Sequence, residues 1–318
     1  MDKKKILIVG FGGIGCRHAQ SLLDKKEYEI HIAEHSDITI KKNLKIIGAN
    51  KNNFIWHKDI KNTPVLDLAI IATSSQPRFE IVKILIKNGF RKFLLEKIVF
   101  QSEKQFYKII EMINKSNSKA YCNFVHRYYI PYKEIKKQLS QSSENINIHI
   151  QGNANELGMG CNAIHFIDLF QYLTGIDEVK LKKYELNLLK GENRRGPIYK
   201  EFYGMLELRN NRKNMITIRT DLKHNEGITI TISQGKKNYH LNQKTQKFLT
   251  NDNDLKMNNE FKIIPSSKLT YITISDIFKN DCRMTQLDQT LLAHTSLFNA
   301  FNTFVYNEHK PETLCPIT

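Results

Sequence analysis

A glycine-rich segment, G-F-G-G-I-G at residues 10–15, restricts the possible folds of this chain more than any other feature. It lies between an apolar run at 5–9 and a helical pattern at 13–23 and follows the G-x-G-x-x-G spacing. Glycines so placed allow a tight turn, close approach of a pyrophosphate and packing of the helix on the strand. The helix N-terminus adds an anion site. A dinucleotide is therefore expected at Gly10, Gly12, Gly13, Ile14 and Gly15. The alternative is a glycine turn that binds nothing.

The first 125 residues alternate short β-rich runs with helical patterns, which is typical of βαβ units. The predicted strands cover residues 5–9, 29–33, 66–72, 92–95 and 120–125. The predicted helices cover residues 13–23, 78–88 and 103–114. This pattern predicts a doubly wound parallel sheet of the Rossmann type, whose ligands bind at the carboxyl ends of the strands.

After residue 125 the pattern changes to consecutive strands, which indicates a mostly antiparallel sheet. The predicted strands cover residues 146–151, 179–189, 199–208, 215–221, 227–233, 238–244 and 271–275. The predicted helices cover residues 132–139, 162–173 and 287–306. The fold class is therefore α/β, with an NAD-binding domain at 1–125 and an α+β substrate domain on an open sheet at 126–318.

Composition excludes several classes of protein. With 41% hydrophobic and 25% charged residues, the chain can bury a core, and no apolar run approaches the length of a membrane span. The net charge of +16 raises the possibility of nucleic-acid binding, but the basic residues are scattered, so a solvated basic surface is preferred. The five cysteines form no C-x-x-C pair, which predicts reduced thiols and a cytoplasmic protein.

Glu34 follows the predicted strand after the glycine loop, where Rossmann folds carry a ribose-binding acid. A carboxylate there accepts a hydrogen bond from a ribose 2′-hydroxyl and repels a 2′-phosphate. The sequence therefore predicts NAD as the cofactor and disfavours NADP. The alternative is an exposed acid that contacts no ligand.

Two further groups of polar residues carry candidate chemistry. Glu96 and Lys97 end a predicted strand, and a lysine at that edge can hold a substrate oxygen. His165 and Asp168 share one face of a predicted helix, and a histidine is suited to accept a hydroxyl proton. The alternatives are a solvated Glu–Lys pair, a structural histidine and half a metal site. No further ligands have the spacing to complete such a site, so no metal is expected.

Together, G-F-G-G-I-G-C-R-H at 10–18, E-K at 96–97 and the segment 162–168 resemble the Gfo/Idh/MocA oxidoreductases, named for glucose-fructose oxidoreductase and inositol dehydrogenase. The resemblance is specific over about residues 5–175 and architectural beyond. It implies that Lys97 and His165, which match the family's E-K-P and D-x-x-x-H motifs, form the catalytic pair. The residues that it implies near the cofactor are Thr73, Ser74, Glu96 and Lys97. The residues that it implies near the substrate are Arg127, Asn162, His165 and Asp168.

The sequence departs from the family motifs at four positions. Ile98 replaces the proline after the lysine, which removes a fixed φ beside Lys97. Ser74 and Arg78 replace the proline and histidine of a T-P-x-x-x-H motif. Cys161 replaces the aspartate of D-x-x-x-H, so Asn162 or Asp168 is expected to take over its substrate contact.

The resemblance implies an NAD(P)-dependent dehydrogenase or reductase that transfers a hydride between nicotinamide and a secondary alcohol or ketone of a sugar, cyclitol or nucleotide sugar. His165 would accept the hydroxyl proton, and Lys97 would bind the same oxygen. The four departures motivate an alternative, a non-catalytic NAD(H)-binding regulator of the same fold. A homo-oligomer formed through the C-terminal sheet is also expected.

The substrate prediction goes one step further. Arg127 follows the last parallel strand, and Arg194 and Arg195 lie in a Gly/Pro-flanked loop at 191–197. Guanidinium groups bind carboxylate or phosphate through two hydrogen bonds, so an anionic substrate is expected. The alternative is an exposed basic loop far from any site.

Overall fold

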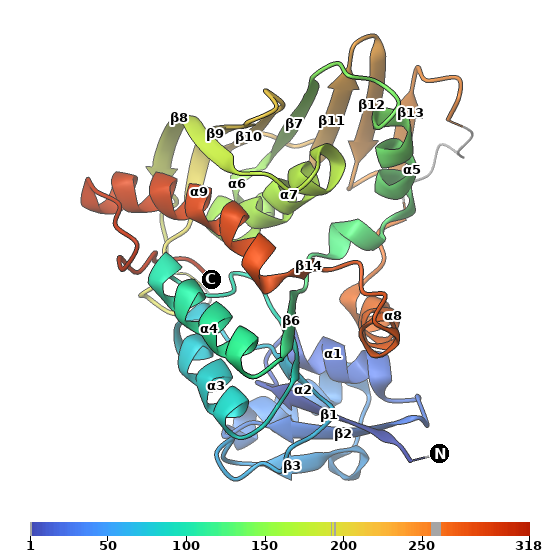
Figure 1. The fold of residues 1–318 in the computed structure, drawn as a ribbon, viewed down its shortest axis with the longest axis vertical. Helices are drawn as coiled ribbons and strands as arrows, with labels where there is room; N and C mark the ends of the chain where they lie inside the picture. The colour runs from blue at the N-terminus through green and yellow to red at the C-terminus, as the bar shows by residue number, and fades with distance from the viewer. Residues whose placement is uncertain (1, 192, 194, 256–261) are drawn as a thin grey trace. The chain divides into compact units, whose positions relative to one another are not determined.

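The computed structural model describes residues 2–191, 193, 195–255 and 262–318, which form two compact units (Figure 1). The first unit comprises Met1–Phe100, Lys104–Asn123 and Ile264–Asp288. The second comprises Gln101–Glu103, Phe124–Ile263 and Gln289–Thr318. The sequence predicts a single boundary after residue 125, whereas the chain returns to the first unit at Ile264–Asp288.

The first unit is built on a seven-stranded sheet of order β14-β6-β5-β4-β1-β2-β3. Its strands are β1 (Lys4–Val9), β2 (Tyr28–Ala33), β3 (Ile55–His57), β4 (Leu68–Ile71), β5 (Lys92–Leu95), β6 (Lys119–Cys122) and β14 (Thr285–Gln286). Neighbours among β1–β6 pair in parallel, and β14 is antiparallel to β6. The strand order reverses between β1 and β4, which is the topological switch point where such sheets bind ligands. The predicted Rossmann sheet is therefore confirmed.

Helices cover both faces of this sheet. They are α1 (Gly15–Leu22), α2 (Asp37–Ile47), α3 (Ser75–Lys87), α4 (Glu103–Lys115) and α8 (Ser266–Lys279), with a 3₁₀ turn η1 (Lys51–Asn53). In Figure 1, α3 and α4 lie on one side of the sheet, and α1 and α8 lie on the other. Burial on both faces explains why the central strands are continuous apolar runs: Ile6, Leu7 and Ile8 of β1 are all 0% exposed.

Helix α8 corrects the prediction of a strand at 271–275. The alternating Y-I-T-I-S segment has the two-residue period of a strand. The residues that are buried, however, are Leu269, Thr270, Thr273, Ile274 and Ile277, which recur at helical spacing. This face packs against α1, so a tertiary contact overrides the local preference for a strand.

The second unit is built on another seven-stranded sheet, of order β13-β12-β11-β7-β10-β9-β8. Its strands are β7 (Ile146–Asn153), β8 (Val179–Leu188), β9 (Phe202–Asn210), β10 (Met215–Asp221), β11 (Thr229–Gln234), β12 (Lys237–Asn242) and β13 (Lys247–Thr250). All neighbours are antiparallel except the parallel pair of β7 and β10. The predicted mostly antiparallel sheet is therefore confirmed.

Helices of the second unit lie on one face of its sheet (Figure 1). They are α5 (Ile130–Leu139), α6 (Ala154–Leu157), α7 (Met159–Thr174) and α9 (Leu287–Tyr306), preceded by a 3₁₀ turn η2 (Val125–Tyr128). Along β7, Ile148 and Ile150 are buried while His149 is exposed, so one face of the sheet forms the core and the other meets solvent. Self-association through this sheet stays a prediction.

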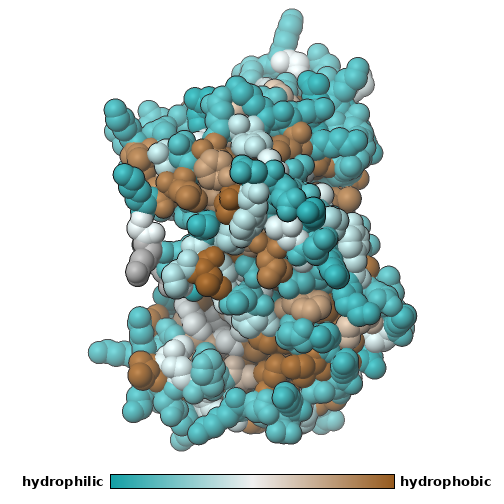
Figure 2. Space-filling model, turned by 90° about the vertical axis from the view of Figure 1, so that its left-hand side faces the viewer, coloured by the Kyte–Doolittle hydropathy of each residue, from teal (hydrophilic) through white to brown (hydrophobic). Residues whose placement is uncertain are grey.

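Hydrophilic residues cover most of the face shown in Figure 2, with smaller apolar patches between them. Such patches are normal, because polar groups are too few to cover a folded protein. Among the residues that the structure describes, none of the helices combines the length and the apolar character needed to cross a membrane.

Candidate functional site

The glycine loop joins β1 to α1 at the carboxyl end of the parallel sheet. Gly10 has a φ of +88°, a conformation that favours glycine, and its N–H donates to the oxygen of Ala33 (2.9 Å). Gly15 begins α1 directly against this turn. A Cβ atom at Gly15 would lie 1.9 Å from the oxygen of Gly10. The helix can therefore pack here only if residue 15 is glycine, as expected for the third glycine of the motif.

The middle of the loop faces open space instead. A Cβ atom at Gly12 or Gly13 would meet no heavy atom within 4 Å, and neither residue has a positive φ that favours glycine. The protein itself therefore does not require glycine at these positions. Ile14, 38% exposed, is the N-cap residue of α1, and the N–H groups of Cys16 and Arg17 in the first turn donate to the main-chain oxygens of Gly12 (3.0 Å) and Ile14 (2.9 Å). This open cradle fits the pyrophosphate of a dinucleotide.

Glu34 lies beside the same loop, directly after β2. Its Oε2 accepts the N–H of Phe11 (2.9 Å), and its Oε1 accepts the N–H groups of His35 and Ser36 (both 3.0 Å). These three bonds hold the carboxylate next to the glycine loop, and its side chain is only 9% exposed. A carboxylate has about four acceptor positions, so it can still accept a ribose hydroxyl.

The end of β4 borders the glycine loop from the other side. A Cβ atom at Gly10 would lie 3.1 Å from Cγ2 of Thr73, which shows how closely the two segments approach. The buried Oγ1 of Thr73 has no hydrogen-bond partner among the described residues. Ser74 precedes α3 as its N-cap residue. Thr73 therefore offers a hydroxyl that a ligand in the loop could satisfy.

Arg78, at the family's histidine position, is only 1% exposed. Its Nη1 donates to the main-chain oxygens of Glu96 and Ile98, on either side of Lys97, and its Nη2 donates to the oxygen of Thr73. The Lys97–Ile98 peptide bond is cis. One planar guanidinium thus ties the end of β4 to the segment that carries Lys97. Sequence analysis identified Arg78 only as a departure from a motif and missed this role.

Glu96 is buried in a polar network and not directed at solvent. Nε2 of His18 donates to its Oε1 (3.0 Å), and so does Nδ2 of Asn123 (2.5 Å). Nδ1 of His18 lies 2.8 Å from Oγ1 of Thr270 on α8. Burial raises the pKa of Glu96, but the bonds from His18 and Asn123 and the charge of Lys97 outweigh it and lower the pKa to about 2. This network favours a structural role for Glu96, which the sequence placed at the cofactor.

This network predicts an acid-dependent loss of stability. A pKa lowered from 4.5 to about 2 stabilises the fold fully above pH 4.5, and the contribution is lost as the pH falls through 2. It corresponds to roughly 3 kcal/mol at neutral pH. Glu96→Gln should lower the free energy of unfolding by up to about that amount at neutral pH and by less below pH 4.5. Urea denaturation at neutral pH and below pH 4.5 measures the free energy of unfolding under both conditions.

The matched control is Glu80→Gln, which removes a carboxylate from an exposed surface pair with Lys83. That variant should change stability little at any pH. An equal loss of stability for Glu96→Gln at all pH values would contradict the assigned ionisation of Glu96.

His165 lies on α7 in the second unit, whereas Lys97 belongs to the first. The His165 ring centroid is 5.8 Å from that of Phe124 and 5.6 Å from that of His126. Burial lowers the pKa of His126 to about 4, so this neighbour is neutral at pH 7. Nδ1 of His126 has no hydrogen-bond partner among the described residues. Sequence analysis missed His126, and its only signal is its position beside Arg127.

Arg127 and Asp168 form a buried ion pair. Nε and Nη2 of Arg127 donate to Oδ2 (2.9 Å) and Oδ1 (2.8 Å) of Asp168, and the two side chains are 8% and 0% exposed. The sequence placed both residues at the substrate. The pair ties η2 to α7, and removing either partner would leave a buried charge. A contact of either residue with substrate stays a prediction. No group of three or more side chains suited to a metal occurs in the described part of the chain.

Cys161 and Asn162 lie one turn before His165 on α7. Nδ2 of Asn162 donates to the oxygen of Leu157, and Sγ of Cys161 accepts a hydrogen bond from Nη1 of Arg195 (3.3 Å). Arg194, the other member of the predicted basic pair, lies outside the described residues. Arg195 therefore lies beside the start of α7, whereas Arg127 is buried in its pair with Asp168.

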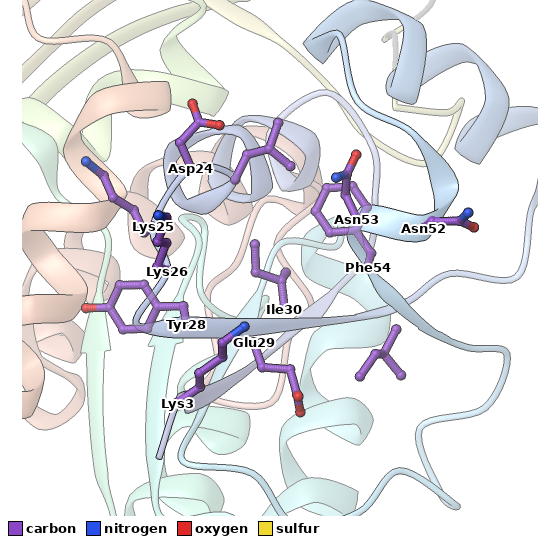
Figure 3. A pocket seen from close by; sticks show the side chains of 12 residues that line it. Lys3, Asp24, Lys25, Lys26, Tyr28, Glu29, Ile30, Asn52, Asn53 and Phe54 are labelled. Carbon is purple, nitrogen blue, oxygen red and sulfur yellow. The ribbon is translucent and has the colours of Figure 1, made fainter. Parts of the chain in front are cut away.

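A cavity of about 530 Å³ opens at the amino end of β2 (Figure 3). Its charged lining residues are Lys3, Asp24, Lys25, Lys26 and Glu29. Parallel sheets bind their ligands at the carboxyl ends of the strands, and the glycine loop lies at that opposite end. This cavity is therefore separate from the proposed dinucleotide site.

Residues 4–124 match the model of the family GFO_IDH_MocA, described as an oxidoreductase family with an NAD-binding Rossmann fold. The match includes the glycine loop, Glu34 and Lys97. No curated protein matches the chain. The resemblance found in the sequence and the prediction of NAD as cofactor are therefore confirmed.

Solved structures share the fold over nearly the whole chain. An oxidoreductase from Agrobacterium radiobacter in complex with NAD+, L-tartaric acid and magnesium has a TM-score of 0.69 and 11% identity, covering 96% of this chain and 97% of that one. The WlbA dehydrogenase from Bordetella pertussis with NADH and UDP-GlcNAcA has a TM-score of 0.68 and 15% identity, covering 100% and 98%. The scyllo-inositol dehydrogenase from Lactobacillus casei with NAD(H) and scyllo-inositol has a TM-score of 0.67 and 17% identity, covering 93% and 95%. Identities this low establish a common fold alone.

Proposed function

Since residues 4–124 match the model of the Gfo/Idh/MocA oxidoreductases, we propose that this protein is an NAD-dependent dehydrogenase or reductase acting on a sugar, cyclitol or nucleotide sugar. The glycine loop carries this proposal, because it is crowded where α1 packs and open where a dinucleotide would lie. The substrate class is supported by proteins of the same fold that were crystallised with scyllo-inositol and with UDP-GlcNAcA.

In this proposal the glycine loop and the first turn of α1 hold the pyrophosphate. Thr73 and Ser74 border the site from the end of β4, and Glu34 accepts the ribose 2′-hydroxyl. Bound NAD supplies hydride transfer, whereas the protein supplies position and electrostatics. The open face at Gly12 and the buried hydroxyl of Thr73 both support this fit.

Lys97 and His165 are proposed as the catalytic pair. His165 accepts the proton of the substrate hydroxyl during oxidation and returns it during reduction, and Lys97 donates a hydrogen bond to the same oxygen. Two observations support the role of Lys97. Arg78 bonds to main-chain oxygens on both sides of it, and the buried network of Glu96 fixes the residue before it. A held backbone limits the freedom of a catalytic side chain.

The second candidate is a regulator that binds NAD(H) without turnover. It is favoured by Cys161, which stands at the family's aspartate position and offers no carboxylate to orient a substrate. In that case the protein would bind NADH, but no sugar would change the cofactor's redox state.

The test is an assay of purified protein with NAD and a panel of sugars, inositols and nucleotide sugars. Near-ultraviolet absorbance follows NADH formation, and fluorescence titration follows NADH binding. A dehydrogenase should oxidise at least one member of the panel, and His165→Asn should abolish that signal. NADH binding without turnover of any member would favour the regulator.

Cofactor preference gives a further prediction. Glu34→Ala removes the charge that repels a 2′-phosphate, so the preference for NAD over NADP should shrink by at least about tenfold. Titration of wild type and variant with both cofactors measures the ratio. The ratio of the NAD and NADP dissociation constants is the readout, because loss of the hydrogen bond to Phe11 would weaken the binding of both cofactors equally.

The matched control is Glu29→Ala, near the amino end of β2, whereas Glu34 follows the carboxyl end of the same strand. It should leave the ratio unchanged. A wild-type protein that prefers NADP would contradict the proposed role of Glu34.

A further inference from the structure

The second unit contains a cavity of about 560 Å³, a size typical of sites for small ligands. Its walls come from the turn before α7, the end of β8 and the segment that leads to β9. Its lining includes Gly158, Cys161, Asn162, Arg195 and Glu201. All of these residues belong to the same compact unit.

The cavity lies along the helix face that carries His165. Cys161 and Asn162 precede His165 by four and three residues on α7, and residues at these spacings share one face of a helix. A ligand in the cavity would therefore follow the side of α7 that presents the proposed proton acceptor.

Arg195 is the cation in this cavity whose contacts are best defined. Its Nη1 donates to Sγ of Cys161 (3.3 Å) and to the main-chain oxygen of Thr318 (2.5 Å). Its Nε and Nη2 make no hydrogen bond within the described part of the chain. This unused edge of the guanidinium has the geometry that binds a carboxylate or phosphate through two parallel hydrogen bonds.

Glu201 decides where in the cavity an anion can bind. Its Oε1 accepts the N–H groups of Gly160 and Phe202 (the latter at 3.1 Å), so a carboxylate already occupies the start of α7. A second anion is disfavoured there by charge repulsion. The negative group of a ligand is therefore directed to Arg195, while Glu201 can accept hydrogen bonds from ligand hydroxyls.

We propose that this cavity binds the anionic group of the substrate, a carboxylate or phosphate on a sugar, and that Arg195 is its anchor. This inference rests on the proposed dehydrogenase function and narrows its substrate class. The remote anionic group would be held at Arg195, and the alcohol to be oxidised would lie nearer His165 along α7. Binding energy from such a remote group can position the reacting carbon.

The experiment measures binding without NAD by isothermal titration calorimetry. The probes are D-glucuronate, D-galacturonate and D-glucose 6-phosphate, each compared with its neutral parent, D-glucose or D-galactose. At least one anionic sugar should bind at least about tenfold more tightly than its parent. The uronates and the phosphate distinguish the two anionic groups. If no anionic sugar binds more tightly than its parent, the proposal is overturned.

Variants test the anchor. Arg195→Gln should remove the preference for the anionic sugar, and Arg195→Lys should restore only part of it, because an ammonium lacks the planar fork. The control is Arg209→Gln, which removes an exposed arginine of β9 that does not line the cavity. It should bind as wild type does. Unchanged preference in Arg195→Gln would overturn the assignment.

Failure of this inference is distinguishable from failure of the proposed function. His165→Asn should abolish turnover but keep the Arg195-dependent binding, because His165 does not line the cavity. If a neutral sugar is turned over and its KM is the same in wild type and Arg195→Gln, the anion site is rejected and the dehydrogenase function is retained. Arg195-dependent binding with no turnover of any substrate would support the site and reject the enzyme.

Discussion

His165→Asn and Lys97→Met are each expected to lower the turnover number for the alcohol substrate at least about 100-fold. Asn cannot accept the hydroxyl proton, and Met cannot donate a hydrogen bond to the substrate oxygen. NAD affinity should change far less, because in this proposal the glycine loop, Thr73 and Glu34 hold the dinucleotide. Steady-state kinetics and an NADH titration measure the two effects separately.

Matched controls for these variants are His149→Asn and Lys104→Met, which change the same residue types at exposed positions on β7 and α4. Both should retain wild-type turnover and stability. Near-normal turnover in His165→Asn and Lys97→Met would refute the catalytic pair. A loss of folding in either variant, detected by thermal denaturation, would assign that residue to structure instead.

Gly15→Ala is expected to destabilise the first unit by more than about 4 kcal/mol. The new Cβ would lie 1.9 Å from the oxygen of Gly10, and this neighbour is backbone that cannot move without shifting β1 or α1. Urea denaturation or failure to obtain folded protein would show the effect. Full stability in Gly15→Ala would mean that α1 is not packed as the structure shows.

Gly12→Ala is the paired experiment in the same loop. A Cβ there meets no heavy atom within 4 Å, so the free energy of unfolding should change by less than about 0.5 kcal/mol. NAD affinity should nevertheless fall at least about tenfold, because the methyl group would occupy the space of the pyrophosphate. Unchanged NAD affinity would place the cofactor elsewhere.

Features carried by short segments could be predicted from the sequence. The glycine loop was predicted because a strand, a turn and a helix follow one another within a few residues, each with its own local signal. The same holds for α9, whose apolar residues recur at helical spacing over its full length. Segment 271–275 shows the limit, because its alternating isoleucines favour a strand locally, whereas packing against α1 makes it part of α8.

The partners of the buried polar residues could not be predicted in this way. Arg127 and Asp168 were each expected to contact substrate, yet they neutralise one another across 41 positions of sequence. Glu96 forms a hydrogen bond with His18, which lies 78 positions away in the sequence. Arg78 donates to main-chain oxygens, and every residue type has such an oxygen, so the sequence does not indicate which ones are bound.

The sequence by itself therefore determined the type of each sheet, the dinucleotide loop and the polar residues available for chemistry. The tertiary structure alone decided which of those residues form buried ion pairs and hydrogen bonds that stabilise the fold. The physical reason is that periodicity and turn preferences act between neighbours in the chain. A buried charge or hydrogen-bonding group instead pairs with a group that the folded chain brings within about 3 Å. Leaving it unpaired costs more free energy than most local conformational preferences contribute.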